Sequence, residues 1–220
     1  MQPIEILESI RQNIRKVIVG RTDTIDLLLT SLVAGGHVLL EDVPGTGKTL
    51  LAKSLAKSMS LVFSRIQFTP DLLPSDVTGL NYFDQKENAF VLQKGPVFTH
   101  ILLADEINRA TPRTQSSLLE SMEEHQVTID GETYLLDEPF FVIATQNPVE
   151  TEGTYPLPEA QLDRFLMQIS MGYPSKEEEL TILDRFGSGN PLTDLKAVCN
   201  KKDLASLKTA ASAIFVHPLL

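Results

Sequence analysis

Residues 43–49 read Val-Pro-Gly-Thr-Gly-Lys-Thr, between the apolar run His37-Val-Leu-Leu-Glu41 and the helix-forming run Leu50-Leu-Ala-Lys-Ser-Leu-Ala56. This order predicts a strand, a glycine-bearing turn and the first turn of a helix. Such a turn points backbone N–H groups toward a ligand at the positive end of the helix dipole, which favours a phosphate chain. A chance glycine turn would not explain Lys-Thr at the helix start. The stretch therefore predicts a nucleoside-triphosphate site.

Two residues of this turn have specific chemistry. Lys48 would reach the β- and γ-phosphates of ATP, and the Thr49 hydroxyl would ligate Mg²⁺. One position departs from the usual pattern, because Asp42 stands where a glycine is expected. The segment that would contact the phosphates consists of Val43, Pro44, Gly45, Thr46, Gly47, Lys48, Thr49 and Leu50.

Length, charge and composition limit the class of protein. The 220 residues suffice for one α/β domain and a second small element. The net charge of −10 argues against unassisted wrapping of nucleic acid, which needs a basic stripe. The single cysteine, Cys199, which we place in a tail helix, rules out an internal disulfide. No apolar run approaches the roughly 18 residues of a membrane span, and the N-terminus is not a secretory signal, so we expect a soluble, cytoplasmic protein.

Hydrophobic periodicity predicts helices and strands in alternation. Helices are expected at residues 4–17 and at Thr22–Val33, the second ended by Gly35-Gly36. The predicted strands are His37–Glu41, Leu61–Gln67, His100–Asp105, Phe140–Thr145 and Phe165–Ser170. Such alternation is typical of a parallel sheet covered on both faces. The segments Thr78–Val91 and Gln126–Leu135 have the alternation and central turn of β-hairpins.

The third predicted strand ends in an acidic pair, Asp105-Glu106. A buried strand that stops there would place both carboxylates at the sheet edge where ligands bind. Asp105 could hold Mg²⁺ through water, and Glu106 could orient and deprotonate an attacking water. The alternative, an acidic helix cap without chemistry, is disfavoured by the phosphate-binding turn upstream.

Two later polar residues would complete an ATPase site. Asn147 follows the fourth predicted strand and could hydrogen-bond the attacking water and the γ-phosphate, although Asn-Pro is also common in turns. Arg164, in Pro158-Glu-Ala-Gln-Leu-Asp-Arg-Phe165, could project into the nucleotide of a neighbouring subunit. Its planar guanidinium suits the charge that develops on phosphoryl oxygens. A surface salt bridge of Arg164 with Asp163 or Glu159 is the competing interpretation.

Taken together, these motifs resemble those of the AAA+ ATPases, and more narrowly those of the MoxR family. The resemblance covers nearly the whole chain. It rests on Val17-Ile-Val-Gly-Arg21, Leu40-Glu-Asp-Val-Pro-Gly-Thr-Gly-Lys-Thr49, Arg65-Ile-Gln-Phe-Thr-Pro-Asp-Leu-Leu-Pro-Ser-Asp-Val-Thr-Gly79, Gly95-Pro-Val-Phe98, Asp105-Glu-Ile-Asn-Arg-Ala-Thr-Pro112, Ala144-Thr-Gln-Asn-Pro148 and Glu159-Ala-Gln-Leu-Asp-Arg-Phe165. The Gln67–Asp76 part is far more specific than a phosphate loop.

The resemblance implies a fold and a domain order. The fold is an α/β P-loop NTPase (AAA+) core of three layers, with a five-stranded parallel sheet in the order 5-1-4-3-2. The two hairpins correspond to family insertions that face the ring axis or a partner. Residues 1–186 would form the ATPase core, and residues 187–220 a helical linker and the start of a truncated lid. The lid of the family carries a second sensor arginine that contacts the γ-phosphate, but no arginine occurs after Arg185. We therefore expect this chain alone to bind ATP weakly and hydrolyse it slowly.

The resemblance also implies roles for single residues. Val19 and Gly20 match a segment that helps to build the adenine pocket, Asn147 matches the first sensor, and Arg164 matches the arginine finger. Family members assemble as rings, usually hexamers, in which each finger completes the neighbour's site. They resemble chaperones that mature other proteins or insert metal cofactors, commonly with a von Willebrand factor A domain protein as partner.

Two alternatives stay open from the sequence. A nucleic-acid motor or a magnesium-chelatase-like subunit would share the hairpin insertions, but the acidic net charge and the lack of lysine-rich hairpin tips disfavour the motor. A nucleotide-dependent binding module without efficient turnover is the non-enzyme alternative. ATP binding, ATP hydrolysis and DNA binding distinguish the three.

Overall fold

The computed structural model describes residues 2–41, 45–148, 153–187 and 189–215. The chain divides into two compact units. One comprises residues 1–36, 47–61 and 173–220, and the other comprises residues 37–46 and 62–172. The predicted boundary between residues 186 and 187, separating an ATPase core from a lid approach, stays a prediction.

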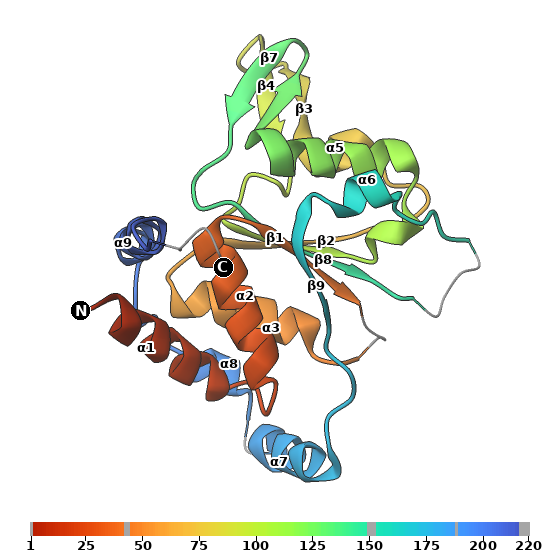
Figure 1. Ribbon diagram of the computed structural model, residues 1–220. Coiled ribbons are helices and arrows are strands. Elements are labelled where there is room, and N and C mark those ends of the chain that lie inside the picture. Colours follow the sequence, from red (N-terminus) through yellow and green to blue (C-terminus); the bar gives the residue numbers. More distant parts are fainter. Residues whose placement is uncertain (1, 42–44, 149–152, 188, 216–220) are drawn as a thin grey trace. The chain divides into compact units, whose positions relative to one another are not determined.

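The second unit is built on a five-stranded sheet (Figure 1). Its strands are β1 (His37–Glu41), β2 (Phe63–Gln67), β5 (Ile101–Asp105), β8 (Phe141–Gln146) and β9 (Phe165–Ser170). All pairs are parallel, and the order is β2-β5-β8-β1-β9, which confirms the predicted order.

Three predicted strand starts lie one or two residues too early. Leu61, for example, precedes β2 because its N–H donates to the carbonyl of Ala56 and closes the end of a helix. His100 and Phe140 likewise precede β5 and β8.

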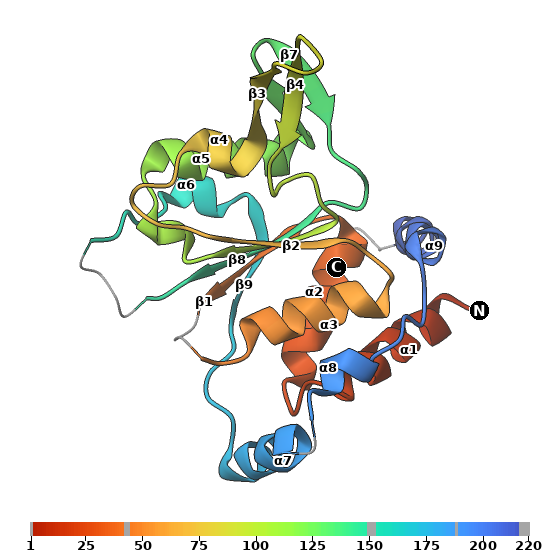
Figure 2. The same cartoon turned by 180° about the vertical axis from the view of Figure 1, so that it is seen from behind.

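One face of the sheet packs against helix α5 (Pro112–Glu124), with the short helices α4 (Pro74–Thr78) and α6 (Glu159–Leu162) on the same side (Figures 1 and 2). This core combines sheet residues such as Leu39, Leu102 and Val142 with Leu118 and Met122 of α5. Residues of the other face of the central strands, Val38, Leu103 and Ile143, are buried as well. Burial on both faces explains why these strands are continuous apolar runs.

Both predicted hairpins are present. The first consists of β3 (Gly79–Asp84) and β4 (Ala89–Lys94), and the second of β6 (Gln126–Ile129) and β7 (Glu132–Leu135). The second turns at Asp130 and Gly131, which both have positive φ (50° and 85°), as tight hairpin turns require. Asn81 Nδ2 donates to Asp130 Oδ2 at 3.0 Å, so the two hairpins contact each other directly.

Gly95, at the base of the first hairpin, leaves no room for a side chain. A Cβ there would lie 2.4 Å from the carbonyl oxygen of Val77 and 2.5 Å from the backbone nitrogen of Gly79. We expect Gly95→Ala to lower the free energy of unfolding by about 1–3 kcal/mol, because rigid backbone must move. Thermal melts measure this loss. Gly187→Ala is the control, since no described heavy atom lies within 4 Å of the added Cβ; an equal loss in both variants would contradict the steric explanation.

The first unit contains the remaining α-helices of the described residues. They are α1 (Pro3–Arg15), α2 (Thr22–Ala34), α3 (Lys48–Ser58), α7 (Lys176–Gly187), α8 (Pro191–Asp194) and α9 (Lys201–Ser212). α1 contacts α2 and α3, and α9 contacts α1 and α2. Gly35 ends α2 in the left-handed conformation (φ 79°), as predicted. Within the described ranges, no helix is long and apolar enough to cross a bilayer.

Cys199 precedes α9, so its predicted place inside a tail helix is wrong. The helix begins after it because Asn200 and Asp203 form a capping box: the Asn200 side chain accepts from Asp203 N at 3.3 Å, and Asp203 accepts from Asn200 N at 2.9 Å. The Cys199 side chain is buried beside Ser58, whose carbonyl oxygen accepts from Cys199 N at 3.3 Å.

Burial raises the pKa of the Cys199 thiol from 9.0 to about 11. The thiolate population at pH 8 is therefore about a hundredfold smaller than in an unfolded chain, and we expect a disulfide reagent to react correspondingly slowly until the protein unfolds. The neutral thiol stabilises the fold below pH 9.0, and this contribution is lost as the pH rises through about 11. Rapid labelling of the folded protein at pH 8 would contradict the burial of the thiol.

Candidate functional site

Three strand ends meet at one edge of the sheet in the second unit. β8 lies between β1 and β5, and the three strands are parallel. Asp105 ends β5, Glu106 follows it, and Asn147 comes directly after β8. β1 ends with Glu41 at this same carboxyl edge, where parallel sheets bind ligands.

Both oxygens of the Asp105 carboxylate accept hydrogen bonds. Thr145 Oγ1 donates to Oδ1 at 2.6 Å. Arg65, on the edge strand β2, donates to Oδ2 through Nη2 at 2.7 Å and through Nε at 3.2 Å. The carboxylate is therefore held in one orientation, with its negative charge balanced by a guanidinium.

Glu106 has an unusual backbone and is also held by neighbours. Its φ and ψ are 56° and 50°, a left-handed conformation that costs a non-glycine residue of the order of 1 kcal/mol or more. Its N–H donates to Thr145 Oγ1 at 2.8 Å. Gln67 Nε2 donates to Oε2 at 2.9 Å, and Arg109 Nε lies 3.0 Å from the same oxygen. Strain at a residue with several partners points to a functional position.

The Asp105 environment is compatible with a hydrated metal ion. No cluster of three or more His, Cys, Asp or Glu that could hold a metal occurs among the described residues. Mg²⁺ at nucleotide sites needs no such cage, because it keeps water and phosphate oxygens as ligands. Asp105 Oδ2 already accepts two hydrogen bonds from Arg65, whereas Oδ1 accepts one from Thr145 and retains a lone pair for a water. The donors therefore fit contact through water better than direct coordination.

In the first unit, α3 begins with the Lys-Thr pair. Gly47 precedes it with φ 90°, and Lys48 and Thr49 are the first two helical residues. No acidic residue lies in the first turn of α3, and none of the described side chains caps it. Such a terminus suits an anion. Gly45 also has positive φ (88°), whereas the predicted contacts Val43 and Pro44 lie outside the described residues.

The Val19-Gly20 segment lies between α1 and α2 of the same unit. Gly20 has φ 66°, and a Cβ there would lie 1.9 Å from Glu178 Oε1, so α7 approaches the backbone closely at this point. Arg185 of α7 donates to the carbonyl oxygens of Arg15 and Lys16 at 2.9 and 3.0 Å. Both contacts tie α7 to the loop that carries the predicted adenine segment.

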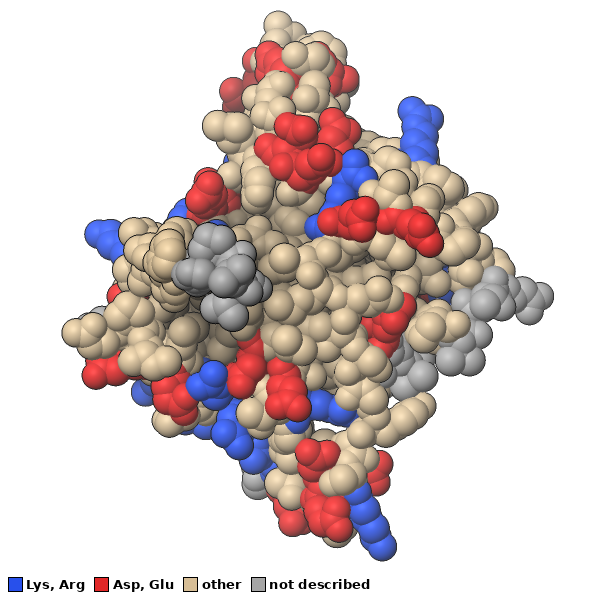
Figure 3. All heavy atoms as spheres, in the orientation of Figure 1, with Lys and Arg blue, Asp and Glu red and all other residues tan. Residues whose placement is uncertain are grey.

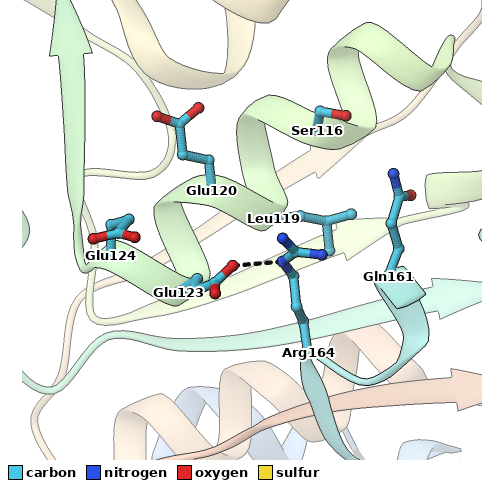
Figure 4. Close-up of a pocket in the computed structure, with 7 residues that line it drawn as sticks. All are labelled: Ser116, Leu119, Glu120, Glu123, Glu124, Gln161 and Arg164. Carbon is cyan, nitrogen blue, oxygen red and sulfur yellow. Dashed lines mark hydrogen bonds and ion pairs between the residues drawn. The ribbon is translucent and has the colours of Figure 1, made fainter. Parts of the chain in front are cut away.

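Arg164 lies between α6 and β9, beside a hollow of about 280 Å³ (Figure 4). Its Nε is 2.8 Å from Glu123 Oε2 on α5, and its Nη1 donates to the carbonyl oxygen of Ala160 at 3.2 Å. The acidic partner is Glu123, and not Asp163 or Glu159 as the competing interpretation assumed. Surface pairs of this kind contribute about 0–1 kcal/mol, so the guanidinium can leave Glu123 at little cost.

Arg65, Gln67 and Thr145 are contact residues that the sequence interpretation missed. Arg65 and Gln67 are two residues apart on β2 and so lie on the same face of that strand. The one available signal was this pair of polar side chains on one face of β2. Thr145 gave no signal, because its role depends on the β5–β8 pairing.

Comparison with known proteins agrees with this architecture. Residues 37–167 match the profile of the ATPase family associated with various cellular activities (AAA). The chain is 46% identical over 217 residues to Chaperone MoxR1 of Mycobacterium tuberculosis, covering 99% of the chain and 57% of that protein. The chain belongs to the MoxR family of AAA+ ATPases. It is also 33% identical over 211 residues to Protein MoxR of Methylorubrum extorquens, covering 92% of the chain and 61% of that protein.

Two further relatives support the assignment. The chain is 56% identical over 197 residues to the uncharacterized protein YeaC of Bacillus subtilis, covering 90% of the chain and 62% of that protein. A crystal structure of a candidate ATPase from Cytophaga hutchinsonii matches with a TM-score of 0.89 at 46% identity, covering 98% of the chain and 66% of that structure. The predicted AAA+ P-loop fold is therefore confirmed. The chain spans 57% to 62% of the length of these three curated relatives.

Proposed function

We propose that the chain binds ATP with Mg²⁺ and hydrolyses it, as part of a ring-forming chaperone of MoxR type that remodels or matures partner proteins. The observation that carries this proposal is the acidic pair Asp105-Glu106 at the carboxyl edge of the sheet. β1 ends at that same edge, directly before the predicted phosphate-binding segment in the sequence, and an acidic pair with a phosphate-binding segment is what an ATPase requires.

In this proposal, the chain binds the nucleotide through two segments. The backbone of residues 43–50 and the Lys48 ammonium bind the phosphates, and Thr49 ligates Mg²⁺. Val19 and Gly20 contribute to the adenine site. The positive φ angles of Gly45 and Gly47 support the first role, because such a turn lets successive N–H groups converge on an anion.

Glu106 is the proposed catalytic base. It orients a water for in-line attack on the γ-phosphate, with Asn147 as a second hydrogen-bonding group. The bonds from Gln67 and Arg109 to Oε2 support this role, because they hold the carboxylate while Oε1 can accept from water. Mg²⁺, when bound, neutralises charge on the phosphate oxygens. Hydrogen bonds from Arg65 and Thr145 hold the Asp105 carboxylate in place.

Arg164 is the proposed finger that completes the site of a neighbouring subunit. This role requires a homo-oligomer, and we propose a hexameric ring. The weak surface pairing with Glu123 supports it, since a finger must be able to move to its target.

The proposed cellular role rests on relatives. The M. tuberculosis relative is named a chaperone, and we propose that this chain also acts on protein clients, with a von Willebrand factor A domain protein as partner. A cytoplasmic location is part of the proposal, because the free cysteine, Cys199, suits a reducing compartment.

Removal of the Lys48 ammonium tests nucleotide binding. We expect Lys48→Ala to weaken the binding of a fluorescent ATP analogue by tenfold or more, since a charge-assisted contact to phosphate is lost, worth about 1.5–3 kcal/mol. Lys53→Ala, on the same helix but one turn further from its N-terminus, is the matched control. Equal affinities of the two variants would remove Lys48 from the phosphate site.

Two assays on the unmodified chain distinguish the alternatives. ATP binding without phosphate release above the buffer blank would favour a nucleotide-dependent binding module. Retention of single- or double-stranded DNA in a filter assay would favour a nucleic-acid-associated ATPase. We expect phosphate release and no DNA retention.

A further inference from the structure

The negative charge of the protein is concentrated in one segment. Residues 114–163 contain 11 of the 29 Asp and Glu and no Lys or Arg. The other 18 acidic residues are balanced by all 19 Lys and Arg, so this segment accounts for the net charge of −10. It comprises most of α5, the β6–β7 hairpin, β8 and the whole of α6, all within the second unit.

The charges cluster at the surface where α5 leads into the second hairpin. Figure 3 shows Asp and Glu side chains gathered over the hairpins and over α5. Exposed acidic residues on α5, on the second hairpin and directly after it are Glu120, Glu123, Glu124, Asp130, Glu132, Asp137 and Glu138. Glu120, Glu123 and Glu124 occupy the last turns of α5, and the final turn contains no basic residue. Negative charge is unfavourable at a helix C-terminus, so these residues do not serve the stability of the helix.

The adjacent hairpin carries exposed aromatic side chains. Phe83 and Phe90, paired across β3 and β4, are 50% and 74% exposed, and their rings meet edge to face with centroids 5.5 Å apart. Asn81, two residues before Phe83 on the same strand face, donates to Asp130 of the second hairpin. The aromatic pair is thus connected to the acidic turn. Large side chains exposed together mark a surface that binds a partner.

We propose that this surface, formed by Phe83, Phe90, Asp130 and Glu132 and named here the hairpin surface, binds a basic, apolar segment of a protein client. The inference rests on the proposed function and names the chemistry of the client. Aromatic faces attract Lys and Arg ammonium and guanidinium groups and also pack against apolar side chains. The carboxylates add long-range attraction for a cationic segment. Nucleic acid is repelled by the same charges.

A labelled peptide in which Lys and Phe alternate is the probe, added to the full chain and followed by fluorescence anisotropy. A peptide with Glu in place of each Lys tests charge, and a peptide with Ser in place of each Phe tests the apolar contribution. We expect only the Lys/Phe peptide to bind well, with affinity that falls as salt is added. Equal binding of the Glu/Phe peptide, or no binding of the Lys/Phe peptide, overturns the proposal.

Two sets of variants locate the site. Phe83→Ser with Phe90→Ser should weaken the Lys/Phe peptide by about tenfold or more, as loss of central aromatic anchors does. Asp130→Asn with Glu132→Gln should weaken it severalfold and reduce its salt dependence. The matched controls are Leu180→Ser with Leu183→Ser and Glu177→Gln with Glu179→Gln, exposed residues of α7 in the other unit. Equal effects of the control variants overturn the proposal.

Two further readouts separate this proposal from its alternatives. Sedimentation compares the self-association of the Phe83→Ser/Phe90→Ser variant with that of the unmodified chain; loss of self-association would assign the hairpin surface to a second copy and overturn the client proposal. Phosphate release is measured in parallel. Specific peptide binding without ATP hydrolysis would sustain the hairpin surface and reject the proposed ATPase function.

Discussion

Replacing Glu106 by Gln should abolish ATP turnover and leave ATP binding intact. The amide keeps the shape of the side chain, but it cannot accept a proton from the attacking water. Loss of a general base lowers turnover by about 10²- to 10⁴-fold. Binding should persist, because in the proposed site the phosphates contact Lys48 and the segment before it. Phosphate release and the affinity for a fluorescent ATP analogue measure the two effects separately.

Glu120→Gln is the matched control for this experiment. Glu120 is an exposed glutamate on α5 within the same unit, so the substitution makes the same chemical change away from the sheet edge. We expect its turnover to equal that of the unmodified chain. Unchanged turnover in Glu106→Gln would remove Glu106 from its catalytic role.

Mixing two inactive variants should restore activity. Arg164→Ala alone is expected to lower turnover by about 10³-fold or more, the usual effect of removing an arginine finger. Glu106→Gln is inactive for the different reason given above. In a mixed ring, a subunit with intact Glu106 can meet a neighbour with intact Arg164, and that site is complete. Phosphate release, measured across mixing ratios, should therefore exceed that of either variant alone.

The control for the mixture replaces Arg164→Ala by Arg113→Ala, an exposed arginine of α5. Arg113→Ala should be active alone, and its mixture with Glu106→Gln should show no synergy. Absence of recovery in the Arg164→Ala mixture, with both variants assembled, would assign Arg164 to its pair with Glu123 and not to a neighbour's nucleotide.

Much of the fold follows from short-range patterns. Continuous apolar runs mark β1, β5 and β8 because strands buried on both faces tolerate few polar side chains. Alternation around Asp130-Gly131 marks the second hairpin because only a tight turn with positive φ reverses the chain there. Strand starts do not follow from these patterns alone: at Leu61 the backbone N–H bonds to the end of a helix and not to the sheet.

The contacts of the acidic pair could not be derived in this way. Arg65 and Asp105 are 40 residues apart, as are Asp105 and Thr145. Their meeting depends on the lateral order β2-β5-β8 and on its register, in which Gln67 lies opposite Asp105. Likewise, Glu123 reaches Arg164 only because α5 and the chain before β9 lie on the same side of the sheet.

The sequence alone was therefore sufficient to predict the glycine turn with Lys48 and Thr49, the acidic pair and the strands around them. Each of these is a local pattern, set by residues a few positions apart in the chain. The partners of each carboxylate, and the left-handed backbone of Glu106, were decided by tertiary packing. Hydrogen bonds between strands are specified by which strands pair and in what register, and no single segment contains that information.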